Sequence, residues 1–423
     1  MKIRTLDGEK IQRRSLDNGT DEQRKTVQAI LERVKKEGDD VLIELTEEFD
    51  GAKLESLKVS EGEIKHAYDS IDEEVIEILR EAAANIHSYH EKQMRQSWMM
   101  TKEDGTVLGQ KVTAIDSVGV YVPGGTAQYP SSVLMGVIPA KVAGVERIAL
   151  VSPPDSNGSL PASVLVAANE GGVTEIYKVG GAQAIGAMTY GTESIPAVDK
   201  IVGPGNIYVA LAKREVFGLV GIDMIAGPSE IVIYADETAN PEHLAADLLS
   251  QAEHDQLATS ILVTTSSKVA KETSKEVIRQ LESLPRREIA EASVISNGVI
   301  YLAASEDEAI AAVNELAPEH LELVAYEPFE LLGKIKHAGA VFIGKNSAEP
   351  VGDYFAGPNH VLPTSGTARF SSPLSVDDYL KKTSVIYYST DALYDHGKKI
   401  SKLARLEGLE AHARAIDIRL EEE

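Results

Sequence analysis

Cysteine is absent from the 423-residue sequence, and this one absence has wide consequences. It excludes disulfide bonds, thiolate metal ligands and any cysteine nucleophile. A long hydrophobic run is also absent. The most apolar stretch, VLMGVIPAKVAGVERIALV, is broken by Lys141, Glu146 and Arg147, so we expect no segment that spans a membrane. The first ten residues, MKIRTLDGEK, lack the apolar region of a signal peptide.

Positive charge is in deficit, because the formal net charge is −24. Binding to nucleic acid or to an anionic membrane needs Lys and Arg clustered on one face, so the charge argues against both. It favours a soluble, cytoplasmic molecule. Hydrophobic residues make up 43% of the chain, which is enough for a large buried interior. The length predicts two or three domains.

The order of apolar patterns along the chain indicates the fold class. Residues 20–48 and 71–97 have helical periodicity, with Gly38 dividing the first stretch. From residue 117 onward, short β-branched runs alternate with glycine-rich turns and helical patterns. These runs are SVGVYVPGG, RIALVSPP, EIYKVGG, KIVGPGN, EIVIYAD, SILVTTS and AVFIGK. Such alternation predicts an α/β, doubly wound, mainly parallel sheet whose ligands lie at the carboxyl ends of strands.

Two features limit this interpretation. The turn GGAQAIGA does not match G-x-G-x-x-G, and an acidic ribose-binding residue cannot be placed, so a normal dinucleotide fingerprint is missing. After SSPLSVDDYL the chain reads as a helical tail of about fifty residues, and a second subunit is a natural surface for it to pack on.

The tetrapeptide Pro-Glu-His-Leu occurs twice, at 241–244 and 318–321. The first copy reads as a helix start, since Asn240 suits the N-cap and Pro241 the first helical position. The second loses helical period within a turn or two. Its Glu319 and His320 could activate water and accept a hydroxyl proton, but residue spacing alone does not separate this role from helix capping.

Three further patterns have both a functional and a structural interpretation. Gln251 and His254 lie three apart on a predicted helix, where they could share a metal or form an ordinary polar pair. The turn-rich stretch 350–370, with Asp353 and His360, could be a binding loop or a surface excursion. His412 falls on an apolar helical face, as an interior histidine often does.

Seven segments, taken together and in this order, resemble the histidinol dehydrogenase family over most of the chain after about residue 20. They are VYVPGGTAQYPSSVLM, VGGAQAIGAMTYGTESIPAVDKIVGPGN, IDMIAGPSE, LLSQAEHD, NELAPEHLEL, GDYFAGPNHVLPTSGTARF and EGLEAHARA. The resemblance implies a zinc-containing, NAD-dependent homodimer that converts L-histidinol into L-histidine in two successive oxidations.

The resemblance also implies a role for twelve positions, none of which departs from the family pattern. Glu319 and His320 match the acid/base pair. The implied zinc ligands are Gln251, His254, Asp353 and His412, the last expected from the partner subunit. Ser229, His360 and Glu407 match further substrate contacts, and Gln251, His254, His320, Asp353 and His412 also face the substrate. The implied NAD contacts are Tyr121, Gln183 and Asn206.

The implied architecture is two incomplete Rossmann-like parallel-sheet domains with N-terminal helices and a helical C-terminal tail. We expect an N-terminal extension (1–20), a discontinuous domain with the metal and catalytic residues (21–112 and 230–372), an NAD-contacting domain (113–229) and a dimerisation tail (373–423). Because the chain lacks cysteine, a thiohemiacetal route for the second oxidation is closed, and Glu319 is the expected activator of water. The alternatives are a zinc-dependent hydrolase and a non-catalytic two-lobed binding protein.

Overall fold

The computed structural model describes residues 1–6, 11, 19–124, 128–173 and 175–421. Part of the predicted extension 1–20, and residues 125–127 of the glycine-rich turn that follows Tyr121, lie outside the described residues. The chain divides into two compact units. We call residues 1–93 and 116–379 the main unit, and residues 94–115 and 380–423 the tail unit. No helix among the described residues is long and apolar enough to cross a membrane.

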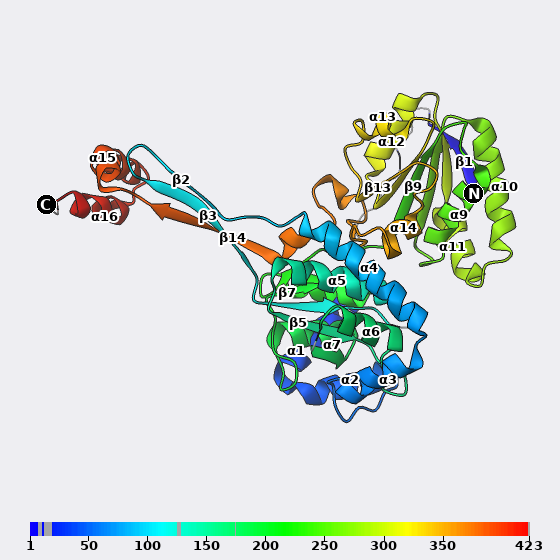
Figure 1. The fold of residues 1–423 in the computed structure, drawn as a ribbon, viewed down its shortest axis with the longest axis horizontal. Helices are drawn as coiled ribbons and strands as arrows, with labels where there is room; N and C mark the ends of the chain where they lie inside the picture. Colours follow the sequence, from blue (N-terminus) through cyan, green and yellow to red (C-terminus); the bar gives the residue numbers. More distant parts are fainter. Residues whose placement is uncertain (7–10, 12–18, 125–127, 174, 422–423) are drawn as a thin grey trace. The chain divides into compact units, whose positions relative to one another are not determined.

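The first sheet of the main unit has five parallel strands in the order β6-β5-β4-β7-β8 (Figure 1). Its elements are β4 (Ser117–Tyr121), β5 (Arg147–Ser152), β6 (Glu175–Lys178), β7 (Lys200–Val202) and β8 (Gly221–Ile222), with α5 (Pro130–Ala143), α6 (Ala162–Glu170), α7 (Gly181–Tyr190) and α8 (Ile207–Val216). Helices α1 (Asp21–Glu37), α2 (Asp39–Asp50), α3 (Glu61–Ser70) and α4 (Glu73–Glu91) also belong here, because they contact α5 to α8.

The second sheet of the main unit has six parallel strands in the order β1-β11-β10-β9-β12-β13. These are β1 (Lys2–Thr5), β9 (Glu230–Ala235), β10 (Thr259–Thr264), β11 (Val299–Leu302), β12 (His320–Val324) and β13 (Ala340–Ile343). The associated helices are α9 (Pro241–Ala252), α10 (Ser267–Leu281), α11 (Arg287–Asn297), α12 (Glu306–Leu316), α13 (Pro328–Leu332) and α14 (Glu349–Tyr354), followed by two 3-10 turns, η1 (Thr367–Arg369) and η2 (Val376–Tyr379).

Side chains alternate between the two faces of this second sheet, as the two-residue period of a strand requires. Ile231 and Ile233 of β9 enter a core with α9, α10 and α11. Val232 and Tyr234 enter the opposite core, which α12 and α13 close. The predicted α/β class is therefore confirmed, and the buried strands are apolar on both faces, as in other covered parallel sheets.

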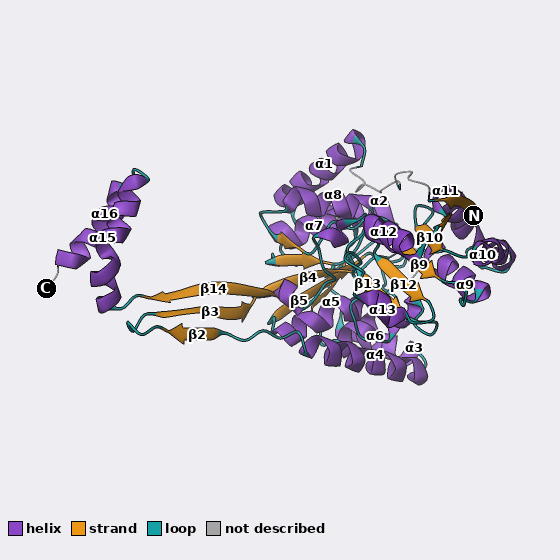
Figure 2. Ribbon diagram, turned by 90° about the horizontal axis from the view of Figure 1, so that it is seen from above, coloured by secondary structure: helices purple, strands orange, loops and turns teal. Residues whose placement is uncertain are grey.

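The tail unit is an antiparallel sheet that leads to two helices (Figure 2). Its strands are β2 (Trp98–Thr101), β3 (Val107–Ala114) and β14 (Leu380–Tyr387), in the order β14-β3-β2, and its helices are α15 (Thr390–Leu406) and α16 (Glu410–Glu421). The prediction of a helical tail over 373–423 was therefore wrong for residues 380–387. The run TSVIY (383–387), rich in β-branched residues, pairs along its length with β3.

The structure also groups the remaining segments differently from the predicted domains. Residues 94–112 join the tail unit. Helices α1 and α2 share a core with the five-stranded sheet through residues such as Leu31, Leu42 and Leu45, and helices α3 and α4 contact α5 and α6 of the same part. Local pattern identifies helices and strands, but it does not say which sheet a helix covers.

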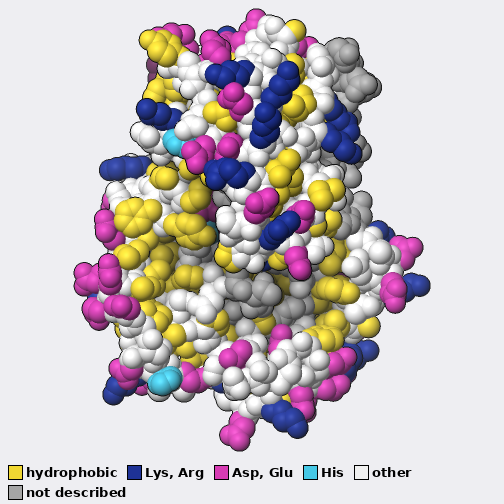
Figure 3. All heavy atoms as spheres, turned by 90° about the vertical axis from the view of Figure 1, so that its right-hand side faces the viewer, with side chains coloured by type: hydrophobic (Ala, Val, Ile, Leu, Met, Phe, Trp, Pro, Cys, Tyr) yellow, Lys and Arg dark blue, Asp and Glu magenta, His cyan; other side chains and the backbone are white. Residues whose placement is uncertain are grey.

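On the face drawn in Figure 3, the described Lys and Arg side chains lie among Asp and Glu side chains.

Candidate active site

A pocket of about 940 Å³ in the main unit is lined from both sheets. From the five-stranded sheet it receives the turns that follow β4, β7 and β8, at the carboxyl ends of those strands. From the six-stranded sheet it receives the residues that precede β9, β10 and β12, at their amino ends. The pocket therefore lies at the carboxyl ends of strands in the first sheet, where the sequence predicts ligand contacts, but at the amino ends of strands in the second sheet.

The pocket collects most of the residues singled out in the sequence. Eight of the twelve line it: Asn206, Ser229, Gln251, His254, Glu319, His320, Asp353 and His360. Tyr121 and Gln183 are buried in the same unit but are not part of the lining, and the Tyr121 hydroxyl accepts a hydrogen bond from the Gly181 N–H at 3.1 Å. Glu407 and His412 belong to the tail unit.

The first Pro-Glu-His-Leu copy begins helix α9, as predicted. The Asn240 side chain accepts a hydrogen bond from the Glu242 N–H, and Pro241 occupies the first turn. The buried residues Leu244 and Leu248 hold the helix on its sheet, and its last turn delivers Gln251 to the pocket. His254 lies just beyond the helix end, so the pair spans a helix terminus.

The second copy begins a strand. Helix α12 ends at Leu316, Ala317 takes a left-handed conformation (φ 48°), and β12 starts at His320 between β9 and β13. A left-handed residue reverses the chain direction after a helix, and here it turns the chain directly into a central strand. Glu319 and His320 are consequently fixed at the buried amino end of β12.

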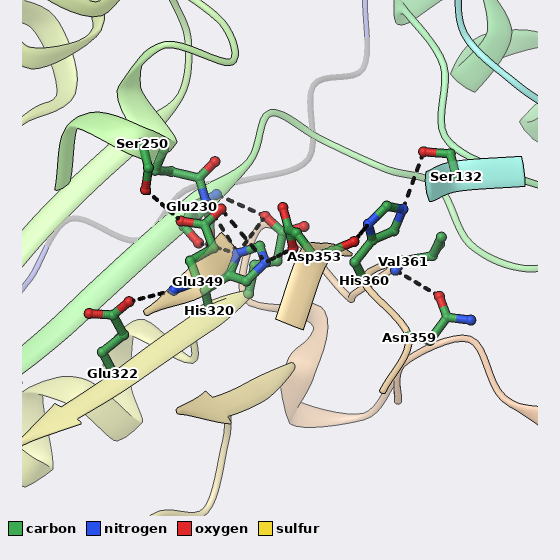
Figure 4. A network of polar contacts seen from close by, with 12 residues as sticks. Ser132, Glu230, Ser250, His320, Glu322, Glu349, Asp353, Asn359, His360 and Val361 are labelled. Atoms are coloured by element: carbon green, nitrogen blue, oxygen red, sulfur yellow. Dashed lines mark hydrogen bonds and ion pairs between the residues drawn. The ribbon is translucent and has the colours of Figure 1, made fainter. Parts of the chain in front are cut away.

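Hydrogen bonds fix the orientation of the His320 ring (Figure 4). Its Nδ1 lies 3.1 Å from the Glu230 carbonyl oxygen and 3.2 Å from Gln251 Nε2. The carbonyl oxygen can only accept a hydrogen bond, whereas the Gln251 amide also donates to Glu349, so we assign the proton to Nδ1, which donates to the carbonyl oxygen. In the neutral ring Nε2 then carries the lone pair, and it has no hydrogen-bond partner among the described residues. Its nearest acidic atoms are Asp353 Oδ1 at 3.8 Å and Glu349 Oε1 at 4.0 Å. The free nitrogen is positioned as a proton acceptor.

Burial and nearby charges shift the pKa values of Glu319 and His320. Burial raises the pKa of Glu319 to about 8, although its Oε2 accepts a hydrogen bond from the Glu230 N–H at 2.8 Å. Burial alone would lower the pKa of His320. The negative charges of Glu319, Glu349 and Asp353 outweigh it and raise that pKa. Perturbed pKa values in a cleft are typical of catalytic sites.

A group of donors suited to a cation lies beside this pair. His254, Glu349 and Asp353 each offer one atom, and these atoms lie within 4.8 Å of one another. Burial lowers the pKa of His254, which favours the neutral, metal-binding imidazole. Burial would raise the pKa of Asp353, but the polar contact with His320, 3.8 Å away, and the nearby histidines lower it, which favours the carboxylate form.

Gln251 offers a further donor. Its Nε2 donates to Glu349 Oε1 at 3.0 Å, whereas its Oε1 is buried and has no hydrogen-bond partner among the described residues. A buried carbonyl oxygen without a partner is costly unless something binds it. The observation fits a cation at this position.

Glu349 was missed in the sequence, although a signal was present. It stands four residues before Asp353, so both carboxylates fall on one face of a helix, and α14 places them there. Because the stretch from residue 350 was predicted to be a turn-rich loop, the helical spacing between Glu349 and Asp353 was not recognised. His360, in the same stretch, donates from Nδ1 to the Asp353 carbonyl oxygen at 3.0 Å, and its Nε2 lies 3.2 Å from Ser132 Oγ.

The tail unit carries a groove of its own between α15 and α16. Glu407 and His412 line it together with apolar residues that include Leu403 and Ile416. His412 is exposed, so the interpretation as a satisfied interior histidine does not hold.

Comparison with known proteins decides the family. The model of the histidinol dehydrogenase family matches residues 12–420. The chain belongs to this family. It is 65% identical to the histidinol dehydrogenase of Geobacillus kaustophilus, over 100% of this chain and 99% of that protein. It is 62% identical to that of Bacillus subtilis, over 99% of each. The crystal structure of histidinol dehydrogenase from Elizabethkingia anophelis is similar with a TM-score of 0.92 and 41% identity, covering 97% of this chain and 94% of that one. The protein is therefore an oxidoreductase.

Proposed function

We propose that this chain oxidises L-histidinol to L-histidine through L-histidinal, with two molecules of NAD⁺, as the final part of histidine biosynthesis in the cytoplasm. The observation that carries the proposal is the unpartnered Nε2 of His320, held in the pocket beside the buried carboxyl group of Glu319. Family membership supplies the substrate, and the pocket supplies a base next to a group that can activate water.

In the first oxidation His320 Nε2 accepts the proton of the alcohol while the adjacent carbon gives a hydride to NAD⁺, which yields the aldehyde and NADH. The hydrogen bond from Nδ1 to the Glu230 carbonyl oxygen stabilises the ring orientation that this transfer needs. It also stabilises the proton on Nδ1 when Nε2 becomes protonated.

In the second oxidation water adds to the aldehyde carbon while His320, protonated in the first step, returns its proton to the carbonyl oxygen, and a hydrate forms. The hydrate then gives a hydroxyl proton to His320 and a second hydride to NAD⁺, which yields the carboxylic acid and NADH. Glu319 takes the proton from the attacking water. With no cysteine in the chain, no thiol can form the covalent adduct that would replace the hydrate. Two oxidations therefore share one pocket and two neighbouring side chains.

We assign a zinc ion to Gln251, His254 and Asp353, with His412 of a second copy as the fourth ligand. The unpartnered Gln251 Oε1 and the neutral His254 fit a cation, and one carboxylate with neutral oxygen and nitrogen donors suits zinc. Glu349 orients the Gln251 amide through its hydrogen bond with Nε2. When bound, the cation offsets the surrounding carboxylates, which lowers the pKa of His320, and orients the substrate.

The remaining predicted residues complete the assignment. Ser229 and His360, in the pocket, and Glu407, in the tail groove, contact the substrate. The five-stranded sheet receives NAD⁺ near Tyr121, Gln183 and Asn206. The exposed apolar side chains of the tail unit, among them Trp98, Met99, Ile386 and Tyr387, support a homodimer in which each tail completes the other chain's site.

One assay tests the proposal. Protein stripped of metal receives L-histidinol and NAD⁺, and absorbance of reduced nicotinamide is followed before and after zinc is restored. We expect activity to return with zinc and to yield about two NADH per histidine, as two hydride transfers require. No NADH after zinc is restored would reject the oxidation and favour the zinc-dependent hydrolase, which needs no NAD⁺, whereas histidinol binding without product would indicate a non-catalytic protein.

A further inference from the structure

A buried lysine and a buried aspartate lie behind the turn that connects β7 to α8. Lys213, on α8, and Asp223, just after β8, form an ion pair whose side chains are only 3% and 1% exposed. Taking two charges out of water is unfavourable, and an apolar pair would avoid this cost. Stability alone therefore does not explain why this site holds an ion pair, whereas the contacts of the two side chains do.

Both ends of the pair hold the peptide groups of Gly203. Lys213 Nζ donates to the Gly203 carbonyl oxygen at 2.9 Å, and Asp223 Oδ2 accepts from the Gly203 N–H at 2.8 Å. The other carboxylate oxygen, Oδ1, accepts from Lys213 and from the Met224 N–H. One residue of the turn is thus fixed from α8 and from the end of β8 at the same time.

The Gly203–Asn206 turn itself has little conformational freedom with which to adjust if the ion pair is lost. Gly203 has φ +110°, and a Cβ atom there would lie 2.1 Å from the Tyr121 carbonyl oxygen, so no larger residue fits. Gly203, Pro204, Gly205 and Asn206 all line the pocket, at the carboxyl end of β7. A small shift of Gly203 would move this whole wall of the pocket.

We propose that the Lys213–Asp223 ion pair is a positioning device that sets the Gly203–Asn206 turn for the dinucleotide. This inference rests on the proposed function, since it assigns the turn to NAD⁺. Neither side chain contacts the reacting atoms. The pair acts on cofactor affinity, and the six-stranded sheet, which carries Glu319, His320 and the metal donors, does not depend on it.

Two double variants test the role. Lys213→Met with Asp223→Asn removes both charges and the donor to the Gly203 carbonyl oxygen. Lys213→Gln with Asp223→Asn removes the charges but keeps an amide donor and acceptor. We expect the first to raise KM for NAD⁺ about tenfold and to leave KM for histidinol within about twofold, as loss of one hydrogen bond in a preorganised site predicts. The second should recover most of the loss.

The control is Lys200→Met on β7. Lys200 is a partly buried lysine whose Nζ donates to the Asp378 carbonyl oxygen, away from the turn, so its loss should not change KM for NAD⁺. Asp223→Glu, which keeps both charges but displaces the turn, gives the same test if the first double variant does not fold. Unchanged KM for NAD⁺ in the folded variants, or equal rises for both substrates, would overturn the inference. Absence of NADH formation by the unmodified protein would reject the proposed function instead.

Discussion

Individual residues in the pocket acquire their chemistry from burial. Glu319 and Glu242 stand at the same place in two identical tetrapeptides, yet Glu242 is exposed at a helix start whereas Glu319 is enclosed at the amino end of β12. The sequence shows the repeat but not the difference in environment. Only the surrounding fold buries one copy and leaves the glutamate of the other exposed.

Glu319→Gln should separate the two oxidations. Glutamine keeps the size and the acceptor for the Glu230 N–H but cannot take a proton from water. We expect the rate of histidinal oxidation to fall by about 10²-fold or more, in the range of general-base catalysis, and histidinol oxidation to change far less. Stopped-flow measurement of each half-reaction tests this. Glu242→Gln is the matched control and should leave both rates unchanged, whereas equal losses with Glu319→Gln would refute the division of roles.

The same residue predicts a pH dependence. Burial raises the pKa of Glu319 to about 8, so its carboxylate form is gained as pH rises through that value. Because only the carboxylate accepts a proton, histidinal oxidation should accelerate up to about pH 8 and then level off. The pH profile of that half-reaction checks the prediction, and Glu319→Gln should lose this rise. A rate that is flat between pH 6 and 9 in the unmodified protein would contradict it.

At the scale of elements, the sequence predicted those whose pattern is local. The break at Gly38 separates α1 from α2, and the runs at 147–152 and 259–264 are β5 and β10, as expected. β12 was missed because its run, HLELV, is short and follows a helix after a left-handed alanine. β14 was missed although its run TSVIY favours a strand, because its partner, β3, precedes it by more than 260 residues and that pairing cannot be predicted from the local pattern.

The tail sheet offers a test at this scale. A Cβ atom on Gly109 of β3 would lie 2.4 Å from the Trp98 carbonyl oxygen of β2, so Gly109→Val should force these strands apart. Since the tail carries Glu407 and His412, we expect loss of most activity and weaker dimerisation, measured by turnover and by light scattering. Gly333→Ala, where a Cβ atom meets nothing within 4 Å, is the control and should behave normally. Full activity of a dimeric Gly109→Val protein would show that the tail is dispensable.

At the scale of the whole molecule, the residues of one predicted site fall into two separate units. Gln251, His254 and Asp353 lie together in the main unit, whereas His412 lies in the tail unit. The family resemblance of the sequence motifs predicts that these four residues belong to one site. The motifs do not show that His412 lies in a different unit from the other three. That placement follows from the pairing of residues 107–114 with residues 380–387, which forms the tail unit.

The most direct test of a site shared between two chains mixes two inactive variants, His412→Asn and His254→Asn. A hybrid dimer has one site with neither substitution and one with both. After complete 1:1 exchange, half the dimers are hybrids, so about a quarter of normal activity should return if tails are exchanged between protomers. No recovery, with hybrid formation verified by differently tagged chains, would show that each tail serves its own chain and would contradict the shared site.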